Sequence, residues 1–250
     1  MLRRIIILAA FFFIQNLLFG QERKQILATY LLINSNANET YTVKTRIDQY
    51  KSLSEFFKIS YNSDTIIAES EENLKIFIKN KETTTSKYYV SKDSIVFLEN
   101  IFVNKKFIPV VVEEKTPQFN WQLKEGSSII SGMICNSASL NFRGRNFIVW
   151  YSPDIPTPFG PWKFYGLPGL IIKVESDDKS ILFQLSKLSY VNQEDIKRPS
   201  SSKTITLQEY ISSQQSVFDD YLEKLRTQLP RGATVSISKK ELNGIERIYE

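Results

Sequence analysis

The chain has 250 residues, of which 42% are hydrophobic and 24% are charged, and its formal net charge is +5. This composition suits a globular protein with a sizeable core, and it excludes collagen-like and wholly disordered chains. The chain has no histidine and one cysteine, Cys135, which excludes histidine-based triads, histidine metal ligands, an intrachain disulfide and cysteine-rich metal clusters.

The first twenty residues have the pattern of a secretory signal peptide. Arg3 and Arg4 precede an unbroken apolar run over residues 5–14, and Gly20 supplies a small residue at the expected cleavage point. A membrane-spanning helix needs about 20 apolar residues, so a retained anchor is the weaker alternative. We therefore predict a cleaved signal peptide over 1–20 and one β-rich domain over 21–250. The processed chain would be soluble, would have no transmembrane span, and would be periplasmic or secreted.

Charge gives little indication of a partner. Removal of residues 1–20 takes away two arginines and leaves 30 basic and 27 acidic residues, a net charge of +3. The basic pairs at Lys105-Lys106 and Lys239-Lys240 are isolated and do not form a stripe. We expect a solvated surface of mixed charge and no nucleic-acid partner.

Along most of the chain, apolar residues recur at every second position, which is typical of β-strands. The strand candidates are residues 24–33, 40–50, 73–80, 85–90, 94–102, 107–113, 128–142, 146–151, 169–175 and 180–188. Residues 52–57 allow a short helical turn instead, and Gly132 suggests a bulge within 128–142. Tight hairpins are expected at 143–145 and 176–179.

One helix is expected near the C-terminus. Residues 206–209 (Thr-Leu-Gln-Glu) form a capping box, and a wide apolar stripe follows at three- and four-residue spacing as far as Pro230. The sheet is the surface that such a stripe can cover. The fold class is therefore mainly β (α+β), with a single curved antiparallel sheet or half-barrel of about ten strands and the helix packed on it. Residues 192–203 read as a loop.

The segment between Ser152 and Leu170 is unusual. It contains five of the nine prolines of the chain, three glycines and several aromatic residues. Proline fixes the backbone and glycine permits special conformations, so this loop should be rigid. Two readings remain open. The loop plugs the sheet and its aromatic residues complete the core, or the aromatic residues form the walls of a binding site.

The same region carries a family resemblance. Residues 166–171 read Gly-Leu-Pro-Gly-Leu-Ile, preceded by Cys135, Gly144-Arg145, Trp150-Tyr151, Asp154-Ile155-Pro156 and Gly160-Pro161-Trp162; residues 243–246 read Asn-Gly-Ile-Glu. The chain thus resembles the GLPGLI family of exported Bacteroidetes proteins, whose closing motif has Pro where Gly244 stands. The resemblance implies a place in the cell envelope and no particular reaction. The candidate binding residues are Arg145, Trp150, Tyr151, Asp154, Pro156, Gly160, Pro161, Trp162, Gly166, Leu167, Pro168 and Gly169.

Catalytic patterns are weaker. Asp154 is a candidate acid without an identifiable partner, and adjacent pairs such as Glu113-Glu114 are expected to be solvated. Arg143 and Arg145 suit either a bound anion or ion pairs with a neighbouring strand. Cys135 has no imidazole base and is expected to be buried. No catalytic residue, metal or cofactor is therefore predicted.

Two main classes of function stay open. The first is a non-catalytic binding or carrier module for an apolar ligand, a peptide or an outer-membrane partner protein. The second is a histidine-free hydrolase that works through Asp154 and another carboxylate. A purely structural envelope protein is a third possibility, and a filled interior without a cavity would favour it. The leaning is against an enzyme, and the oligomeric state stays open.

Overall fold

The computed structural model describes residues 24–59, 66–68, 75–77, 84–103, 106–227 and 245–246. The expected signal peptide over 1–20 lies outside these residues. Within the described part of the chain, no helix is long and apolar enough to cross a membrane.

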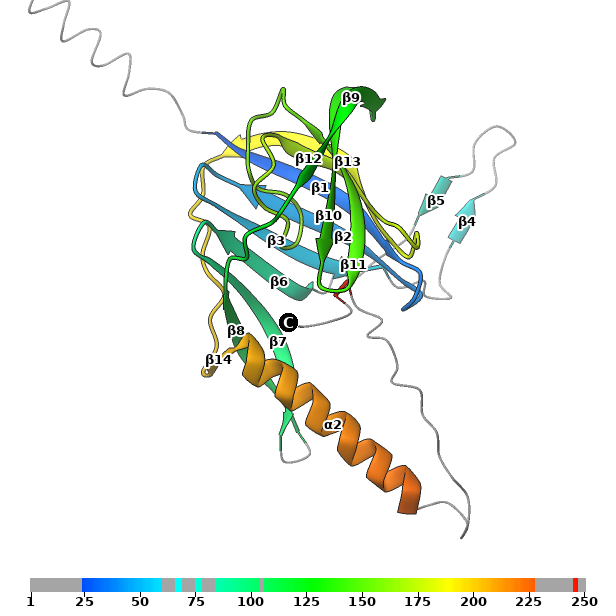
Figure 1. The fold of residues 1–250 in the computed structure, drawn as a ribbon, viewed down its shortest axis with the longest axis vertical. Coiled ribbons are helices and arrows are strands. Elements are labelled where there is room, and N and C mark those ends of the chain that lie inside the picture. Colours follow the sequence, from blue (N-terminus) through cyan, green and yellow to red (C-terminus); the bar gives the residue numbers. More distant parts are fainter. Residues whose placement is uncertain are drawn as a thin grey trace, which may run out of the picture.

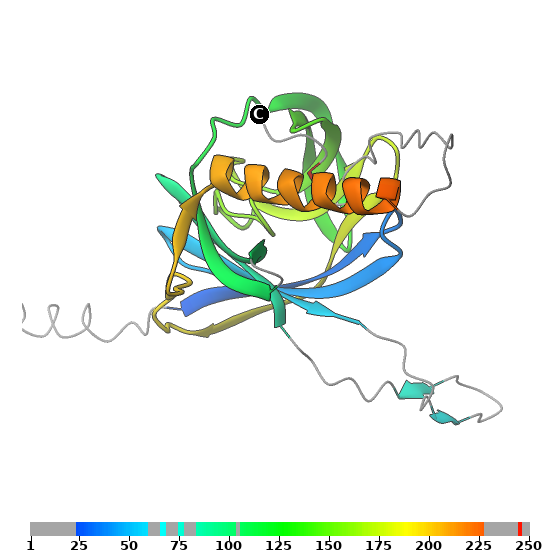
Figure 2. The same cartoon turned by 90° about the horizontal axis from the view of Figure 1, so that it is seen from below.

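Twelve strands form one open, curled sheet (Figures 1 and 2) in the order β14-β8-β7-β6-β3-β2-β1-β13-β12-β11-β10-β9. Every pairing is antiparallel except that of β14 with β8. The mainly β fold class and the single curved sheet are thereby confirmed. The strands are β1 (Lys24–Asn34), β2 (Glu39–Ile47), β3 (Lys51–Lys58), β6 (Thr84–Ser91), β7 (Ser94–Val103), β8 (Lys106–Lys115), β9 (Gln122–Ile130), β10 (Met133–Phe142), β11 (Arg145–Ser152), β12 (Leu170–Ser176), β13 (Ile181–Asn192) and β14 (Thr204–Thr206). A separate two-stranded sheet joins β4 (Ile66–Ala68) and β5 (Lys75–Phe77).

Alternation along the strands sets the core. In β1 the side chains of Ala28, Tyr30 and Leu32 are buried, and the residues between them are partly exposed. Because successive side chains of a strand point to opposite faces, one face of the sheet collects the apolar residues. The loop 153–169 packs into the concave side and closes this core.

Two local expectations were wrong. Residues 52–57 belong to β3 and not to a helical turn, because Ser52, Ser54 and Phe56 alternate inward and the small serines fit the crowded core face. The stretch 128–142 is not one bulged strand. Ser131 (φ 51°) and Gly132 (φ 77°) form a two-residue turn between β9 and β10. Both residues have a positive φ, which is the requirement of a tight hairpin turn that matches the strand twist.

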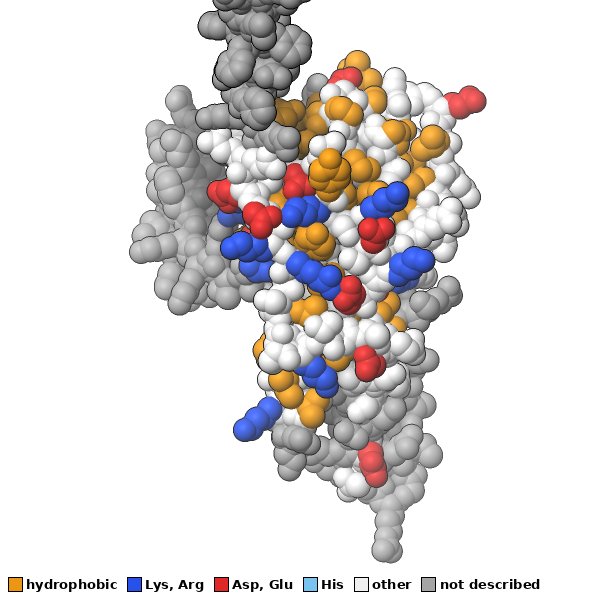
Figure 3. Space-filling view, turned by 90° about the vertical axis from the view of Figure 1, so that its left-hand side faces the viewer, with side chains coloured by type: hydrophobic (Ala, Val, Ile, Leu, Met, Phe, Trp, Pro, Cys, Tyr) orange, Lys and Arg blue, Asp and Glu red, His pale blue; other side chains and the backbone are white. Residues whose placement is uncertain are grey.

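The two predicted hairpins are confirmed. Arg143 and Gly144 connect β10 to β11, and residues 177–180 connect β12 to β13. Figure 3 shows basic and acidic side chains interspersed with apolar ones over one face of the molecule, as the mixed-charge surface predicts.

The helix α2 (Leu207–Thr227) begins where the sequence predicts. The backbone N–H of Thr206 donates to Glu209 Oε2 over 2.7 Å, and the N–H of Glu209 donates to Thr206 Oγ1 over 3.2 Å, so the capping box is formed. The helix contacts β7, β8 and β14 at one end of the sheet. Tyr210 meets the ring of Phe97 edge-on, with 6.1 Å between the ring centroids.

Candidate functional site

The proline-rich loop serves the core at most of its aromatic positions. Trp162 and Phe164 are 2% and 0% exposed, and their ring centroids lie 5.1 Å apart in an edge-to-face pair. The loop is tied by its own backbone: Gly160 N–H donates to the Phe164 carbonyl over 3.0 Å. Phe164 therefore completes the core, as the first of the two interpretations of the loop predicts. Trp162 also belongs to the core, but it lines a cavity as well.

Trp162 is held in an unusual conformation. Its φ of 59° lies in the left-handed region, which a bulky residue rarely adopts. Its backbone N–H donates to the buried Ser54 Oγ over 3.1 Å, and that oxygen also lies 2.9 Å from Thr45 Oγ1. The serines of β3 thus fix the point at which the loop enters the core.

The structure places the other candidate residues in three environments. Arg145 is buried and donates to Asp178 Oδ2 (2.8 Å) and Ser180 Oγ (2.7 Å), so it ties the β12–β13 hairpin. At Gly169 a Cβ would lie 2.3 Å from the Ser152 carbonyl oxygen, which explains the glycine by close backbone approach. The remaining candidates differ in their exposure. The buried ones are Tyr151, Gly160, Pro161 and Leu167, the partly exposed one is Trp150, and the exposed ones are Asp154, Pro156, Gly166 and Pro168. Pro156 lines a second cavity of about 620 Å³, beside Tyr50.

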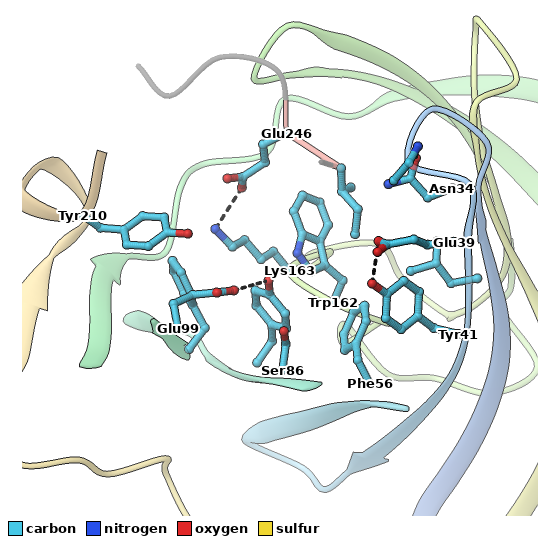
Figure 4. Close-up of a pocket in the computed structure, with 15 residues that line it drawn as sticks. Asn34, Glu39, Tyr41, Phe56, Ser86, Glu99, Trp162, Lys163, Tyr210 and Glu246 are labelled. Atoms are coloured by element: carbon cyan, nitrogen blue, oxygen red, sulfur yellow. Dashed lines mark hydrogen bonds and ion pairs between the residues drawn. The ribbon is translucent and has the colours of Figure 1, made fainter. Parts of the chain in front are cut away.

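The main candidate site is a half-open cavity of about 360 Å³ on the concave side of the sheet (Figure 4). Among the twelve candidate residues, only Trp162 lines it. β2, β3, β6, β7, the loop and α2 contribute aromatic walls, and residues 245–246 reach the same cavity. These walls are Tyr41, Phe56, Tyr88, Phe97, Trp162 and Tyr210.

A buried cluster of charges borders this cavity, and two of its members, Lys163 and Glu246, line it. Lys163 Nζ lies 2.7 Å from Glu114 Oε1 and 2.9 Å from Glu246 Oε1. Arg143 Nη1 lies 2.6 Å from Glu246 Oε1, and Arg143 also pairs with Glu114 through Nη2. The four side chains are 10% exposed or less. Two cations and two carboxylates balance, which is the condition under which buried charges are tolerated.

The ammonium group of Lys163 also faces aromatic rings. It lies 4.2 Å from the ring centroid of Phe97 and 5.6 Å from that of Trp162. Such cation–π contacts add to the ion pairs where water is excluded. Lys163 is thereby fixed by two carboxylates and by the aromatic wall.

Carboxyl groups in the cavity have pKa values shifted in opposite directions. Burial raises the pKa of Glu99, although the Tyr88 hydroxyl, which lies 3.3 Å from Glu99 Oε1, and the charge of Lys163 oppose this. Burial also acts to raise the pKa of Glu39, but hydrogen bonds from Lys58 and Tyr41 outweigh it and lower that pKa. Glu99 thus favours its neutral form more than Glu39 does.

Sequence reasoning missed the carboxylates of the cavity and of the buried charge cluster beside it. Glu113-Glu114 reads as a solvated pair, yet the strand period separates the two residues: Glu113 pairs with Arg198 near the surface, and Glu114 is buried. The signal that could have identified Glu114 is its place in β8, in phase with the buried Val110 and Val112. Arg143 does form ion pairs, but its partners are Glu114 of β8 and Glu246, and not residues of a strand adjacent to its hairpin.

Cys135 is buried, as expected, and its Sγ lies 3.4 Å from the Met133 carbonyl oxygen. Burial raises the pKa of its thiol, so the thiolate that a nucleophile needs is disfavoured. Within the ranges that the structure describes, no group of three or more Cys, Asp or Glu side chains is arranged to hold a metal ion.

Comparison with known proteins gives structural neighbours only. No protein-family profile matches the chain, and no curated protein matches it. A solved structure of PNGF-II in space group P21 superposes with a TM-score of 0.52 at 13% identity, covering 76% of this chain and 33% of PNGF-II. A C2 crystal form gives a TM-score of 0.50 at 12% identity, with coverage of 76% and 32%. This chain therefore spans about a third of PNGF-II, and the likeness concerns the fold alone.

Proposed function

We propose that the protein is an exported binding module of the cell envelope, of the GLPGLI type, which holds a small ligand with an apolar body. The observation that carries this proposal is the half-open cavity of about 360 Å³ with its six aromatic walls. Ligand sites are commonly concave, of roughly 300–1,000 Å³, and mostly apolar with a few polar groups. Export is supported by the basic and apolar pattern of residues 1–20.

The cavity counts against a purely structural role. The loop 153–169 fills much of the concave side, yet the space beside Trp162 is left open between β2, β3 and β7. Concave, aromatic-walled spaces of this size are typical of ligand sites. An open, aromatic-walled space is therefore better explained by an occupant than by support of the sheet.

Filling the cavity tests the proposal. Ser86 of β6 is partly buried and lines the cavity, whereas its neighbour Thr85 is exposed. We expect Ser86→Phe to weaken binding of the neutral apolar dye N-phenyl-1-naphthylamine at least about tenfold, because the added ring occupies the site. The measurement is a fluorescence titration, with circular dichroism as the check on folding.

Thr85→Phe is the matched control, since it adds the same ring at an exposed neighbouring position that does not line the cavity. It should bind the dye as the unsubstituted protein does. Equal binding by Ser86→Phe and the unsubstituted protein would show that the dye lies elsewhere, and no binding by the unsubstituted protein would remove the proposal. Native mass spectrometry of protein purified from its own envelope would then identify the natural occupant.

A second candidate, a carboxylate-dependent hydrolase, is favoured by the opposed pKa shifts of Glu99 and Glu39 in one cavity. Carboxyl groups whose environments push their pKa values apart suit the roles of acid and base. Asp154, the candidate acid from the sequence, is exposed and lines neither the aromatic cavity nor the cavity beside Tyr50. The enzyme hypothesis therefore moves to Glu99 and Glu39, which line the cavity.

Aryl glycosides with a p-nitrophenyl leaving group test this second candidate. Hydrolysis that is lost in Glu99→Gln and kept in Glu113→Gln would support it. The absence of hydrolysis across such a panel, by protein that binds the dye, would leave the binding function alone.

A further inference from the structure

Glu246 comes to the cavity from far along the chain. It lies 83 residues from Lys163 and 103 from Arg143, yet its side chain is 4% exposed and its Oε1 contacts both cations. One carboxylate oxygen thus bridges an ammonium and a guanidinium group (Figure 4 shows the bond to Lys163). Ile245 lies beside it and also lines the cavity.

The two carboxylates of the charge cluster differ in how they are held. Glu114 belongs to β8, which is paired with β7 along ten register positions. Glu246 follows the last described helix and belongs to none of the described strands. Without Glu246, one carboxylate would face two buried cations. Because a buried charge without a partner is costly, Arg143 and Lys163 require a second anion at this place.

The surroundings of that anion position are apolar and aromatic. Ile245, Phe97 and Trp162 line the same cavity. Glu99 lies close enough to interact electrostatically with Glu246, and burial raises the pKa of Glu99. Burial thus disfavours the charged form of Glu99, which reduces its repulsion of an incoming anion. An occupant that satisfies all these groups carries one carboxylate on an apolar body.

We propose that Arg143 and Lys163 form a carboxylate-binding site, that Ile245–Glu246 occupies it as an internal ligand, and that the cavity takes an apolar monocarboxylate whose head group replaces the carboxylate of Glu246. This inference rests on the proposed binding function and specifies its ligand class. The incoming carboxylate accepts the hydrogen bonds that Arg143 and Lys163 donate to Glu246. Its chain or ring lies in the open part of the cavity, against the aromatic wall.

Decanoate and 1-decanol form a matched pair of probes, because they share the length of their carbon chain and differ in the carboxylate. Their binding is measured by displacement of N-phenyl-1-naphthylamine from the full chain, from Glu246→Gln and from Glu113→Gln. We expect Glu246→Gln to bind decanoate about tenfold more tightly than the unsubstituted protein, the factor for a site that is internally occupied about nine-tenths of the time. Decanol should bind Glu246→Gln and the unsubstituted protein equally.

Glu113→Gln removes a neighbouring surface carboxylate outside the cluster, so it should behave as the unsubstituted protein does. Equal affinities of Glu246→Gln and the unsubstituted protein for decanoate would overturn the inference, as would tightening for decanol as well. Decanol binding without decanoate binding would overturn the inference and keep the binding function. If the dye, decanoate and decanol all fail to bind, both the inference and the proposed binding function would be overturned.

If Glu246→Gln does not fold, Glu246→Asp provides the second test. It keeps the charge but sets the carboxylate back by one methylene, which loosens the bridge to the two cations. Decanoate affinity should then lie between those expected for the unsubstituted protein and Glu246→Gln. An affinity no greater than that of the unsubstituted protein would again overturn the inference.

Discussion

At the scale of single residues, the buried charges are the positions at which sequence reasoning was least informative. Lys163 is one of two charges in the proline-rich loop, and nothing near it in the sequence names its partners, Glu114 and Glu246. Ion pairs between residues so far apart depend on the register of the sheet and on the path of the C-terminal residues. A sequence supplies the charges but not their pairing.

The pH dependence of stability should reveal this cluster. Burial acts to raise the pKa of Glu114, but Lys163 and Arg143 outweigh it and lower that pKa below its ordinary value. A carboxyl with a lowered folded pKa stabilises the fold above its unfolded pKa, and this stabilisation is lost as the pH falls through the folded pKa. Glu114→Gln should therefore cost about 3 kcal/mol near neutral pH, and the cost should shrink on acidification below about pH 4.

Urea denaturation at a series of pH values measures this cost. Glu113→Gln is the control, because Glu113 is 40% exposed and its pair with Arg198 should contribute at most about 1 kcal/mol. A pH-independent difference between Glu114→Gln and the unsubstituted protein would contradict the assignment of the effect to ionisation.

At the scale of elements, the sequence predicted well what is local. The capping box at Thr206, the hairpin at Gly144 and the alternation of residues 24–33 each depend on neighbouring residues, and each is confirmed. The two errors differ in origin. Ser54 of β3 accepts the backbone N–H of Trp162, which lies 108 positions away. The Ser131-Gly132 turn is local, and Ile130 and Met133 pair directly across it.

The helix cap gives a prediction at this scale. Thr206→Ala removes the hydroxyl that accepts the backbone N–H of Glu209, so we expect a loss of about 1 kcal/mol in the free energy of unfolding. Chemical denaturation followed by far-ultraviolet circular dichroism measures it. Thr204→Ala, in exposed β14 two residues earlier, is the control and should cost less. Equal losses would show that the cap contributes nothing beyond strand propensity.

At the scale of the whole molecule, the fold class and the curved sheet could be predicted, but the candidate site could not. Of the twelve candidate residues, the structure brings only Trp162 to the aromatic cavity. The remaining walls come from α2 and from strands whose order in the sheet could not be predicted from the sequence. The compositional signal of proline, glycine and aromatic residues located a rigid core segment correctly. The same signal did not predict the cavity that lies beside that segment.

The strand order also determines when the sheet can be completed. The middle of the sheet is the seam between β1, the first described strand, and β13, with Lys24 opposite Asn192. Gln25 is further joined to Glu194 by side-chain to backbone hydrogen bonds that span 169 positions. A chain emerging from its N-terminus therefore exposes one edge of β1 until residues 181–192 have followed. Contacts of such separation make folding slow, and the pairing of β1 with β13 can be completed only after residue 192 of the 250 has been delivered.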